Sequence, residues 1–180
     1  GRLKPMRVAA VVPCWNVAHR VGEVVRSLRQ HVDAVVAVDD GSSDDTARVA
    51  AQAGATVVRH AVNRGYGASV TTGFAWAMEN GFDVAVMFDG DGQFDAAEVP
   101  RVVEPILAGR AEAVFGSRFL PGAPTRAVPL LKRWMIHRPA RLLERLLTGL
   151  DLTDVHNGFR AFSVPALGRM DLDYDRYAFQ

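Results

Sequence analysis

The stretch VAVMFDGDGQ, residues 84–93, joins an apolar run directly to two carboxylates and an amide. Val84 to Phe88 is typical of a buried strand in a parallel sheet, and open α/β folds bind ligands outside the carboxyl ends of such strands. Asp89 and Asp91 place oxygen ligands two residues apart, and Gly90 between them allows close backbone approach, which suits Mg²⁺ or Mn²⁺ bridging a diphosphate. On its own the pattern fits a polar turn, a hairpin or a calcium loop equally well, so the surrounding sequence has to decide.

The composition is that of a folded globular protein. Hydrophobic residues make up 49% of the 180 residues and charged residues 23%, which excludes an intrinsically disordered chain. The single cysteine, Cys14, excludes an internal disulfide and agrees with a reducing compartment. Because Cys14 ends an apolar run, a buried structural thiol is favoured over a reactive one.

Residues 1–180 are expected to form one catalytic domain with a sizeable core. No apolar run approaches the length of a transmembrane helix, and no signal peptide precedes the first predicted strand. Residues 1–5 fit a cloning remnant. The sequence stops at Tyr177-Ala178-Phe179-Gln180 without a terminating pattern, which leaves open a continuation that includes a membrane anchor.

Apolar runs alternate with helical periodicity along the chain. Strands are predicted at residues 7–12, 34–38, 55–59, 84–88 and 113–116, with Pro13 ending the first. Helices are predicted around residues 21–28, from a Ser/Asp cap cluster at 39–43 to about Ala53, from about Ala68 to Asn80 with Gly81 as its stop, and up to about Ala108 with interruptions at Pro100 and Pro105. This order predicts an α/β fold whose parallel or mostly parallel sheet is covered by helices on both faces.

Polar clusters follow three of the predicted strands, at residues 13–16, 39–42 and 89–93. Because the carboxyl ends of parallel strands meet at one edge of a sheet, we expect these clusters to converge there. A dinucleotide-binding dehydrogenase is disfavoured, since residues 13–16 read Pro-Cys-Trp-Asn where Gly-x-Gly-x-x-Gly would be required. The glycine-rich segment 63–67 follows the third strand and has the wrong spacing, and a P-loop lysine is absent. A nucleotide diphosphate held by a divalent cation is the interpretation that remains.

Six motifs in order resemble family 2 glycosyltransferases, and within that family dolichyl-phosphate or polyprenyl-phosphate sugar synthases. They are Pro13-x-Trp15-Asn16, Asp39-Asp40-Gly41-Ser42, Asn63-Arg64-Gly65-Tyr66-Gly67, Asp89-Gly90-Asp91-Gly92-Gln93, Gly116-Ser117-Arg118 and Asp154-x-x-Asn157-Gly158-Phe159-Arg160. The match runs from about residue 7 to 165. It implies a GT-A fold, a nucleotide-sugar donor of the GDP-mannose or UDP-glucose type, and inverting hexose transfer that needs Mg²⁺ or Mn²⁺.

The resemblance also implies site residues. The metal and diphosphate would be held by Asp89, Asp91 and Gln93, and the donor would be bound by Pro13, Trp15, Asn16, Asp39, Asp40, Asn63, Gly65 and Gly90. Two positions depart from the family: Val17 stands where an acidic residue is frequent, and Tyr66 where lysine is frequent. The base is therefore left open, although Trp15 can stack on any base.

The acceptor determines which further groups the reaction needs. A hydroxyl acceptor has to lose its proton, and Asp154 is the base by its motif position. A phosphate acceptor is already anionic and needs cations, for which Arg118 and Arg160 are placed by motif and Arg133 is a weaker choice. An ion pair between Arg160 and Asp154 is an equally good interpretation of Arg160.

The segment at residues 126–150 interleaves leucines and Trp134 with basic side chains. Seven of the chain's 21 basic residues, and only one of its 20 acidic residues, fall within residues 118–145. Broken by Pro139 into two amphipathic helices, this segment is typical of a membrane interface, although a helix that packs on the core gives the same pattern. Nucleic acid is disfavoured as a partner, because no nucleic-acid motif accompanies the charge.

The leading hypothesis is an inverting, metal-dependent transfer of a hexose to a polyprenyl phosphate. The enzyme is expected to be cytoplasmic and peripheral to the cytoplasmic face of the membrane. One alternative is a family 2 enzyme acting on a hydroxyl of a glycan, protein or small molecule. A non-catalytic nucleotide-sugar binding module is another. A sugar nucleotidyltransferase is disfavoured, because it should carry a glycine-rich basic signature after the first strand.

Overall fold

The computed structural model describes residues 5–90, 95–116 and 159–170. The chain divides into two compact units, one of Gly1–Val114 with Phe159–Gln180 and one of Phe115–Gly158. Apart from Phe115 and Gly116, every described residue belongs to the first unit.

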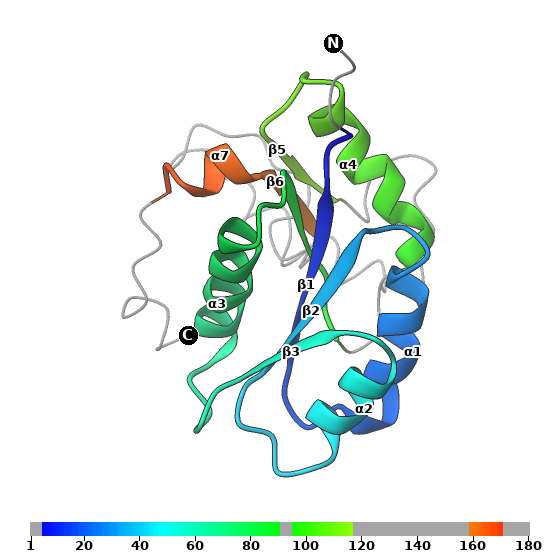
Figure 1. The fold of residues 1–180 in the computed structure, drawn as a ribbon, viewed down its shortest axis with the longest axis vertical. Helices are drawn as coiled ribbons and strands as arrows, with labels where there is room; N and C mark the ends of the chain where they lie inside the picture. Colours follow the sequence, from blue (N-terminus) through cyan, green and yellow to red (C-terminus); the bar gives the residue numbers. More distant parts are fainter. Residues whose placement is uncertain (1–4, 91–94, 117–158, 171–180) are drawn as a thin grey trace, which may run out of the picture. The chain divides into compact units, whose positions relative to one another are not determined.

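Strands and helices alternate in the first unit, as Figure 1 shows. The elements are β1 (Val8–Cys14), α1 (Ala18–Leu28), β2 (Ala34–Asp39), α2 (Thr46–Gln52), β3 (Thr56–Arg59), α3 (Tyr66–Glu79), β4 (Val84–Met87), the 3₁₀ turn η1 (Ala96–Glu98), α4 (Val99–Leu107), β5 (Ala113–Phe115), β6 (Arg160–Ser163) and α7 (Val164–Leu167). The strand order is β3-β2-β1-β4-β6-β5. Strands β3, β2, β1 and β4 pair in parallel, and β6 runs antiparallel to β4. The predicted mostly parallel sheet is confirmed.

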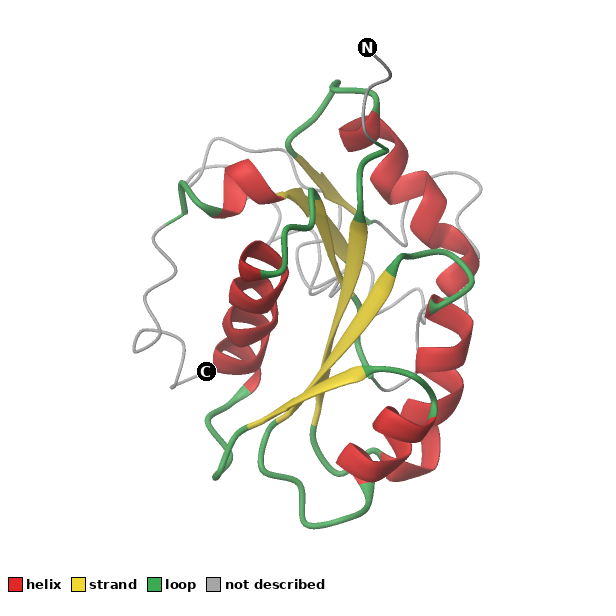
Figure 2. Ribbon diagram, viewed as in Figure 1, coloured by secondary structure: helices red, strands yellow, loops and turns green. Residues whose placement is uncertain are grey.

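Helices cover both faces of the sheet. Because neighbouring residues of a strand point to opposite faces, each strand contributes side chains to two separate core clusters. In β1, Ala10 and Val12 belong to the core cluster that includes residues of α1 and α4, whereas Ala9 and Val11 belong to the cluster that includes residues of α3. Figure 2 shows α3 on one side of the strands and α1, α2 and α4 on the other. The continuous apolar runs of the sequence are therefore explained by burial on two faces.

Close packing of α3 on the sheet depends on one glycine. A Cβ atom at Gly73 would lie 2.1 Å from Cγ1 of the fully buried Val11, so only a residue without a side chain fits there. The glycine thus fixes how near α3, and the loop that precedes it, can approach β1.

The structure differs from the sequence prediction at three prolines. Strand β1 does not end at Pro13 but continues to Cys14, which pairs with Asp39 of β2. Pro13 is tolerated because its missing N–H falls on the β4 side, where pairing has already ended at Val11. Pro100 and Pro105 do not interrupt the helical segment, since Pro100 occupies the first turn of α4 and Pro105 lies within it.

The most consequential difference is strand β6, which was not predicted. Residues 160–163 form this strand and pair with β4, with Arg160 opposite Met87 and Ser163 opposite Val84. Its inner face is apolar: Phe162 meets Phe74 of α3 edge-on, with ring centroids 5.6 Å apart. Strand β6, which is distant in the sequence, is thereby brought next to β4, the strand that leads to Asp89.

Candidate functional site

Hydrogen bonds tie the loop after β1 to the loop after β2. Asn16 adopts a φ of 51°, and its backbone N–H donates to Ser42 Oγ at 2.9 Å. Its side-chain Oδ1 accepts from the backbone N–H of Ser43, also at 2.9 Å. Asn16 is thus engaged in holding two loops together, and this placement leaves the neighbouring Trp15 side chain 58% exposed. An exposed indole at the carboxyl edge of the sheet can stack on a planar ring.

Asp39 ends β2 and is 1% exposed. Its Oδ1 accepts from the backbone N–H of Ser42 at 3.1 Å. Its Oδ2 forms an ion pair with Arg59, whose Nε lies 3.0 Å away. This contact does not have the geometry of a hydrogen bond, and no described residue donates a hydrogen bond to this buried oxygen. Arg59 is oriented by a second bond, from Nη2 to the carbonyl of Ser42 at 2.9 Å. A buried oxygen without a hydrogen bond can accept one from an N–H or O–H group of a ligand.

Asp40 differs from its neighbour, because protein groups satisfy its carboxylate. It accepts from the backbone N–H groups of Arg64, at 2.9 Å, and Gly65, at 2.8 Å. Nδ1 of the buried His60 lies 2.7 Å from Oδ1, and His60 Nε2 lies 2.9 Å from the Thr72 hydroxyl. Since a carboxylate only accepts, Nδ1 carries the proton in this tautomer and Nε2 accepts from Thr72. Asp40 therefore organises the loop that leads into α3.

Two glycines with positive φ shape this loop and its contact with the loop after β2. Gly65 has a φ of 93° and a ψ of 164°, a region open essentially only to glycine. Gly41 has a φ of 68°, and a Cβ there would meet the backbone N of Asn63 at 2.7 Å. Asn63 Oδ1 also accepts from the Gly65 N–H at 3.1 Å. The predicted donor residues Asn63 and Gly65 thus give this loop its shape.

Asp89 follows β4 and is half-buried. The hydroxyl of Tyr66, the first residue of α3, donates to Asp89 Oδ1 at 2.6 Å. The next residue, Gly90, allows a close approach of two backbones: a Cβ there would lie 2.9 Å from the carbonyl oxygen of Pro13. The polar clusters after β1, β2 and β4 therefore meet at one edge, as far as Gly90.

A divalent cation fits the chemistry at Asp89, because carboxylate oxygens are the ligands that Mg²⁺ and Mn²⁺ prefer. The other predicted ligands, Asp91 and Gln93, lie outside the described residues. Within residues 5–90, 95–116 and 159–170, the side chains of His, Cys, Asp and Glu form no group of three that could hold a metal ion. A complete ligand set at this edge thus depends on the segment after Gly90.

Arg160 begins β6 opposite Met87 and is half-buried. Because β6 is antiparallel to β4, its first residue lies at the same edge of the sheet as Asp89. Arg118, Arg133, Asp154 and the basic segment 126–150 lie outside the described residues, so their assigned roles stay predictions. Arg59 and His60 were missed by sequence reasoning, although their position at the end of β3 is the same signal that marked the other clusters.

Cys14 is buried and its thiol donates to the carbonyl of Val12 at 3.2 Å. Burial, and then the negative charge of Asp39, raises the pKa of the Cys14 thiol to about 12. The expectation that Cys14 is buried is confirmed.

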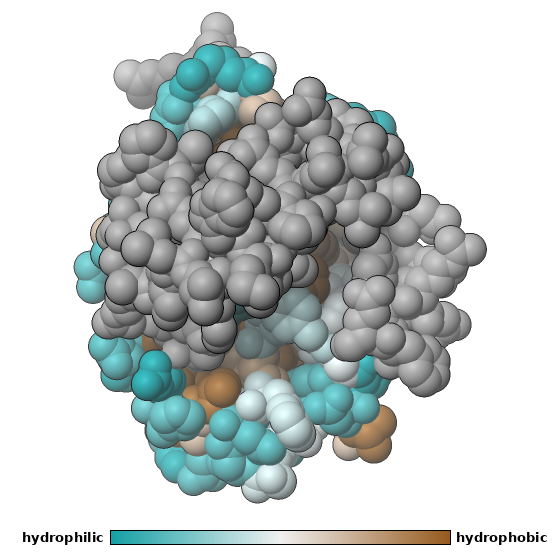
Figure 3. All heavy atoms as spheres, turned by 180° about the vertical axis from the view of Figure 1, so that it is seen from behind, coloured by the Kyte–Doolittle hydropathy of each residue, from teal (hydrophilic) through white to brown (hydrophobic). Residues whose placement is uncertain are grey.

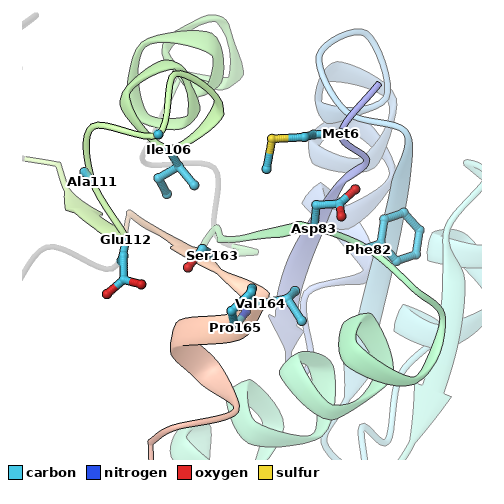
Figure 4. A pocket seen from close by; sticks show the side chains of 10 residues that line it. Met6, Phe82, Asp83, Ile106, Ala111, Glu112, Ser163, Val164 and Pro165 are labelled. Carbon is cyan, nitrogen blue, oxygen red and sulfur yellow. The ribbon is translucent and has the colours of Figure 1, made fainter. Parts of the chain in front are cut away.

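The opposite edge of the sheet contains a hollow of about 410 Å³ (Figure 4). Its walls come from the segments that precede β1 and β4 and follow α4 and β6, and they include Met6, Phe82, Ile106, Glu112 and Pro165. It is therefore separate from the polar clusters at the carboxyl edge. In Figure 3 the described surface is mainly hydrophilic, with apolar residues in separate patches. None of the helices formed by the described residues has the length and apolar character needed to span a bilayer.

Comparisons with known proteins agree with this geometry. The family description "Glycosyl transferase family 2" matches residues 9–170. An undecaprenyl-phosphate mannosyltransferase of Micrococcus luteus is 33% identical over 93% of this chain and 71% of its own length. A UDP-N-acetylglucosamine–dolichyl-phosphate N-acetylglucosaminyltransferase of Methanococcus voltae is 31% identical over 87% of this chain and 69% of its own length.

A solved structure is also similar. Glucosyl-3-phosphoglycerate synthase of Mycobacterium tuberculosis, crystallised with Mn²⁺, UDP-glucose and phosphoglyceric acid, superposes with a TM-score of 0.69 at 25% identity. The superposition covers 90% of this chain and 58% of that enzyme, so the chain spans somewhat more than half of its length. With the family description matching nearly the whole sequence, this chain belongs to glycosyl transferase family 2 and is a glycosyltransferase with a GT-A fold.

Proposed function

We propose that this chain is the catalytic domain of an inverting, metal-dependent glycosyltransferase that moves a hexose from a nucleotide sugar to a polyprenyl phosphate. The observation that carries the proposal is the hydrogen-bonded carboxyl edge of the sheet. An exposed indole, a buried carboxylate oxygen without a hydrogen bond from any described residue, and the Asp89 carboxylate occur together there. These are the groups that a base, a nucleoside and a metal-bound diphosphate need.

The nucleoside is assigned to Trp15 and Asp39. The exposed Trp15 side chain offers a stacking surface for the base. Asp39 Oδ2 accepts a hydrogen bond from an N–H or O–H of the nucleoside, which supplies the donor that it lacks among the described residues. Arg59 forms an ion pair with the same oxygen, with its Nε 3.0 Å away, and so helps to hold the carboxylate in place.

The leaving group is a nucleoside diphosphate, whose negative charge grows as the sugar is released. A divalent cation held by Asp89, Asp91 and Gln93 would supply the charge that stabilises it. Asp89 is presented after β4, and the absence of a side chain at Gly90 lets its backbone lie close to the carbonyl of Pro13. Inversion follows if the acceptor attacks the sugar from the face opposite the diphosphate.

A phosphate acceptor is supported by the relatives and by Arg160. The two relatives named above are called undecaprenyl-phosphate and dolichyl-phosphate transferases, and they differ in their sugar. Arg160 starts the strand beside β4, so a guanidinium lies at the edge where the acceptor has to enter. Guanidinium binds phosphate in bidentate fashion, and Arg118 and Arg133 are proposed to add further contacts.

The lipid acceptor implies work at a membrane surface. Residues 126–150 are proposed to lie in the interface on the cytoplasmic side, with their basic side chains toward anionic headgroups. Binding of the purified protein to vesicles with and without anionic lipid tests this part. Equal binding to both kinds of vesicle would count against it.

The donor half of the proposal is tested by thermal shift with GDP- and UDP-sugars, each with and without Mn²⁺. We expect one donor to raise the midpoint only when metal is present, by the equivalent of about 2.7 kcal/mol at a hundredfold excess over Kd. EDTA should abolish the shift. If no nucleotide sugar stabilises the protein under any condition, the donor site is wrongly assigned.

The acceptor half is tested by transfer of a labelled sugar to polyprenyl phosphate in detergent. Retained transfer in Asp154→Asn together with loss in Arg118→Ala supports a phosphate acceptor. If the wild type transfers no sugar to polyprenyl phosphate but transfers it to a hydroxyl acceptor, and Asp154→Asn abolishes that transfer, Asp154 is the base of a hydroxyl-directed enzyme, an alternative favoured by the phosphoglyceric acid in the solved relative. A protein that binds the donor but neither hydrolyses nor transfers it would be a binding module.

A further inference from the structure

Tyr66 connects the loop before α3 to the acidic residue after β4. Its hydroxyl donates to Asp89 Oδ1 at 2.6 Å, within the range of hydrogen bonds to a charged acceptor. The side chain is 51% exposed, so core packing alone does not account for its position. Its partner, Asp89, is the one described residue among the three proposed metal ligands.

The position of Tyr66 is set by Asp40. The carboxylate of Asp40 accepts from the N–H groups of Arg64 and Gly65, the two residues directly before Tyr66. The φ of 93° at Gly65 then turns the chain into α3. Asp40 is itself held by His60 at 2.7 Å. Hydrogen bonds, together with the covalent chain from Gly65 to the Tyr66 side chain, therefore connect the buried His60 to the side chain of Asp89.

We propose that Tyr66 is a positioning residue for the divalent cation, and that it acts by fixing the orientation of the Asp89 carboxylate. The inference rests on the proposed function, since it requires that Asp89 binds metal. It adds that residues 63–66 join Asp40, which is next to the proposed nucleoside-binding residue Asp39, to the diphosphate end of the site.

The physical reason is orientation of a metal ligand by its hydrogen-bond partner. A carboxylate has two oxygens with about four acceptor positions, so a bond to Oδ1 fixes its plane without exhausting its capacity to bind. Removing such a partner typically weakens metal binding by about 10- to 100-fold. Because the Tyr66 ring is anchored through the backbone at Gly65, the hydroxyl is already in place before the cation arrives.

The test is the Mn²⁺ affinity of Tyr66→Phe, measured by electron paramagnetic resonance with Mn²⁺ alone and with added UDP or GDP. The variant keeps the ring and loses only the hydroxyl. We expect Mn²⁺ to bind about tenfold more weakly than in the wild type. Thr71→Val is the matched control, because it removes a hydroxyl from α3 that bonds only to the carbonyl of Gly67 in the described structure. Its Mn²⁺ affinity should not change.

A second measurement follows the contact itself in metal-free protein. The Tm changes of Tyr66→Phe, Asp89→Ala and the double variant in EDTA should be non-additive, because both single changes remove the same hydrogen bond. Unchanged or tighter Mn²⁺ binding in Tyr66→Phe would overturn the proposal, as would additive Tm changes. If wild-type protein binds nucleotide and Mn²⁺ while Tyr66→Phe behaves like it, only this inference fails. If the wild type binds neither, the proposed function fails with it.

Discussion

Two adjacent aspartates, Asp39 and Asp40, have different tasks although the sequence presents them as a pair. Asp39 keeps one buried oxygen without a hydrogen bond from a described residue, whereas Asp40 is surrounded by donors. The difference arises because consecutive strand residues point to opposite sides, so each carboxylate meets a different loop. The motif shows that carboxylates are needed, but their separate tasks depend on Arg59 and His60, which come from another strand.

His60→Ala should destabilise the protein and weaken donor binding together. The substitution removes one of the donors to the buried Asp40 carboxylate and takes away the imidazole partner of the Thr72 hydroxyl, which costs about 1–3 kcal/mol. Chemical denaturation measures the loss of stability, and nucleotide titration measures the weaker binding. His19→Ala is the control, because His19 is exposed and should leave both quantities unchanged. Full stability in His60→Ala would show that Asp40 does not depend on this contact.

Cys14 should resist alkylation in the folded protein. Only the thiolate reacts, and burial, followed by the charge of Asp39, raises the pKa of the thiol to about 12. At pH 8 the native protein should therefore remain unlabelled by iodoacetamide, while the unfolded protein in guanidinium chloride should be labelled completely. Mass spectrometry distinguishes the two states. Rapid labelling of native protein would mean that the end of β1 opens far more readily than its burial implies.

At the scale of elements, the sequence predicts what depends on local pattern and misses what depends on distant pairing. Strands β1, β2 and β4 were found because apolar runs buried on two faces are continuous. β6 was not found, because four residues contain too little periodicity and their partner strand lies more than seventy positions earlier. Helix α3 begins at Tyr66 rather than near Ala68, since Gly65 and Asp40 set its start. The Tyr66–Asp89 contact was therefore not predictable from the sequence.

Asp44 connects two helices, and its contribution to stability should depend on pH. It accepts from the N–H of Ala18 at the start of α1 and from the N–H and hydroxyl of Thr46 at the start of α2. Slight burial tends to raise the pKa of Asp44, but these hydrogen bonds outweigh it and hold the pKa below its ordinary value of 3.8. A carboxylate with a lowered pKa stabilises the fold above its unfolded pKa, and this stabilisation is lost as the pH falls through the folded pKa.

Asp44→Asn should consequently lower the Tm at neutral pH and have a progressively smaller effect as the solution is acidified below the ordinary pKa of the carboxyl. Scanning calorimetry of wild type and variant across this range measures the difference. Asp95→Asn provides a comparison, because Asp95 caps only η1. A Tm difference that stays constant down to the lowest pH would exclude a role for the charge of Asp44.

At the scale of the whole first unit, the two edges of the sheet are held by different means. The carboxyl edge is cross-linked by side chains that the proposed function needs, such as Asn16, Asp40 and Tyr66. At the other edge, Asp33 and Asp83 accept from the backbone N–H groups of Val8 and Arg7, and the Arg7 guanidinium lies 4.1 Å from the Phe82 ring centroid. Carboxylates thus hold both edges, but only those at the carboxyl edge lie among the proposed site residues.

Strand β6 spans these two edges, so a substitution in its apolar middle should affect stability and transfer together. Phe162 is buried and meets Phe74 of α3, and Arg160 stands two residues before it at the carboxyl edge. Phe162→Ala leaves a cavity and should cost about 3–5 kcal/mol, a large part of the stability of an ordinary domain. Because donor groups lie on β1, β2 and β4, nucleotide binding at low temperature should survive while sugar transfer falls.

Denaturant unfolding, donor titration and the transfer assay, all performed at low temperature, measure these three effects. Met170→Ala removes an exposed side chain that follows the same segment and should change none of them. Phe162→Leu, which restores most of the volume, should recover the greater part of both stability and transfer. If Phe162→Ala lost stability but kept full transfer, β6 would be a purely structural strand and Arg160 would have no part in acceptor binding.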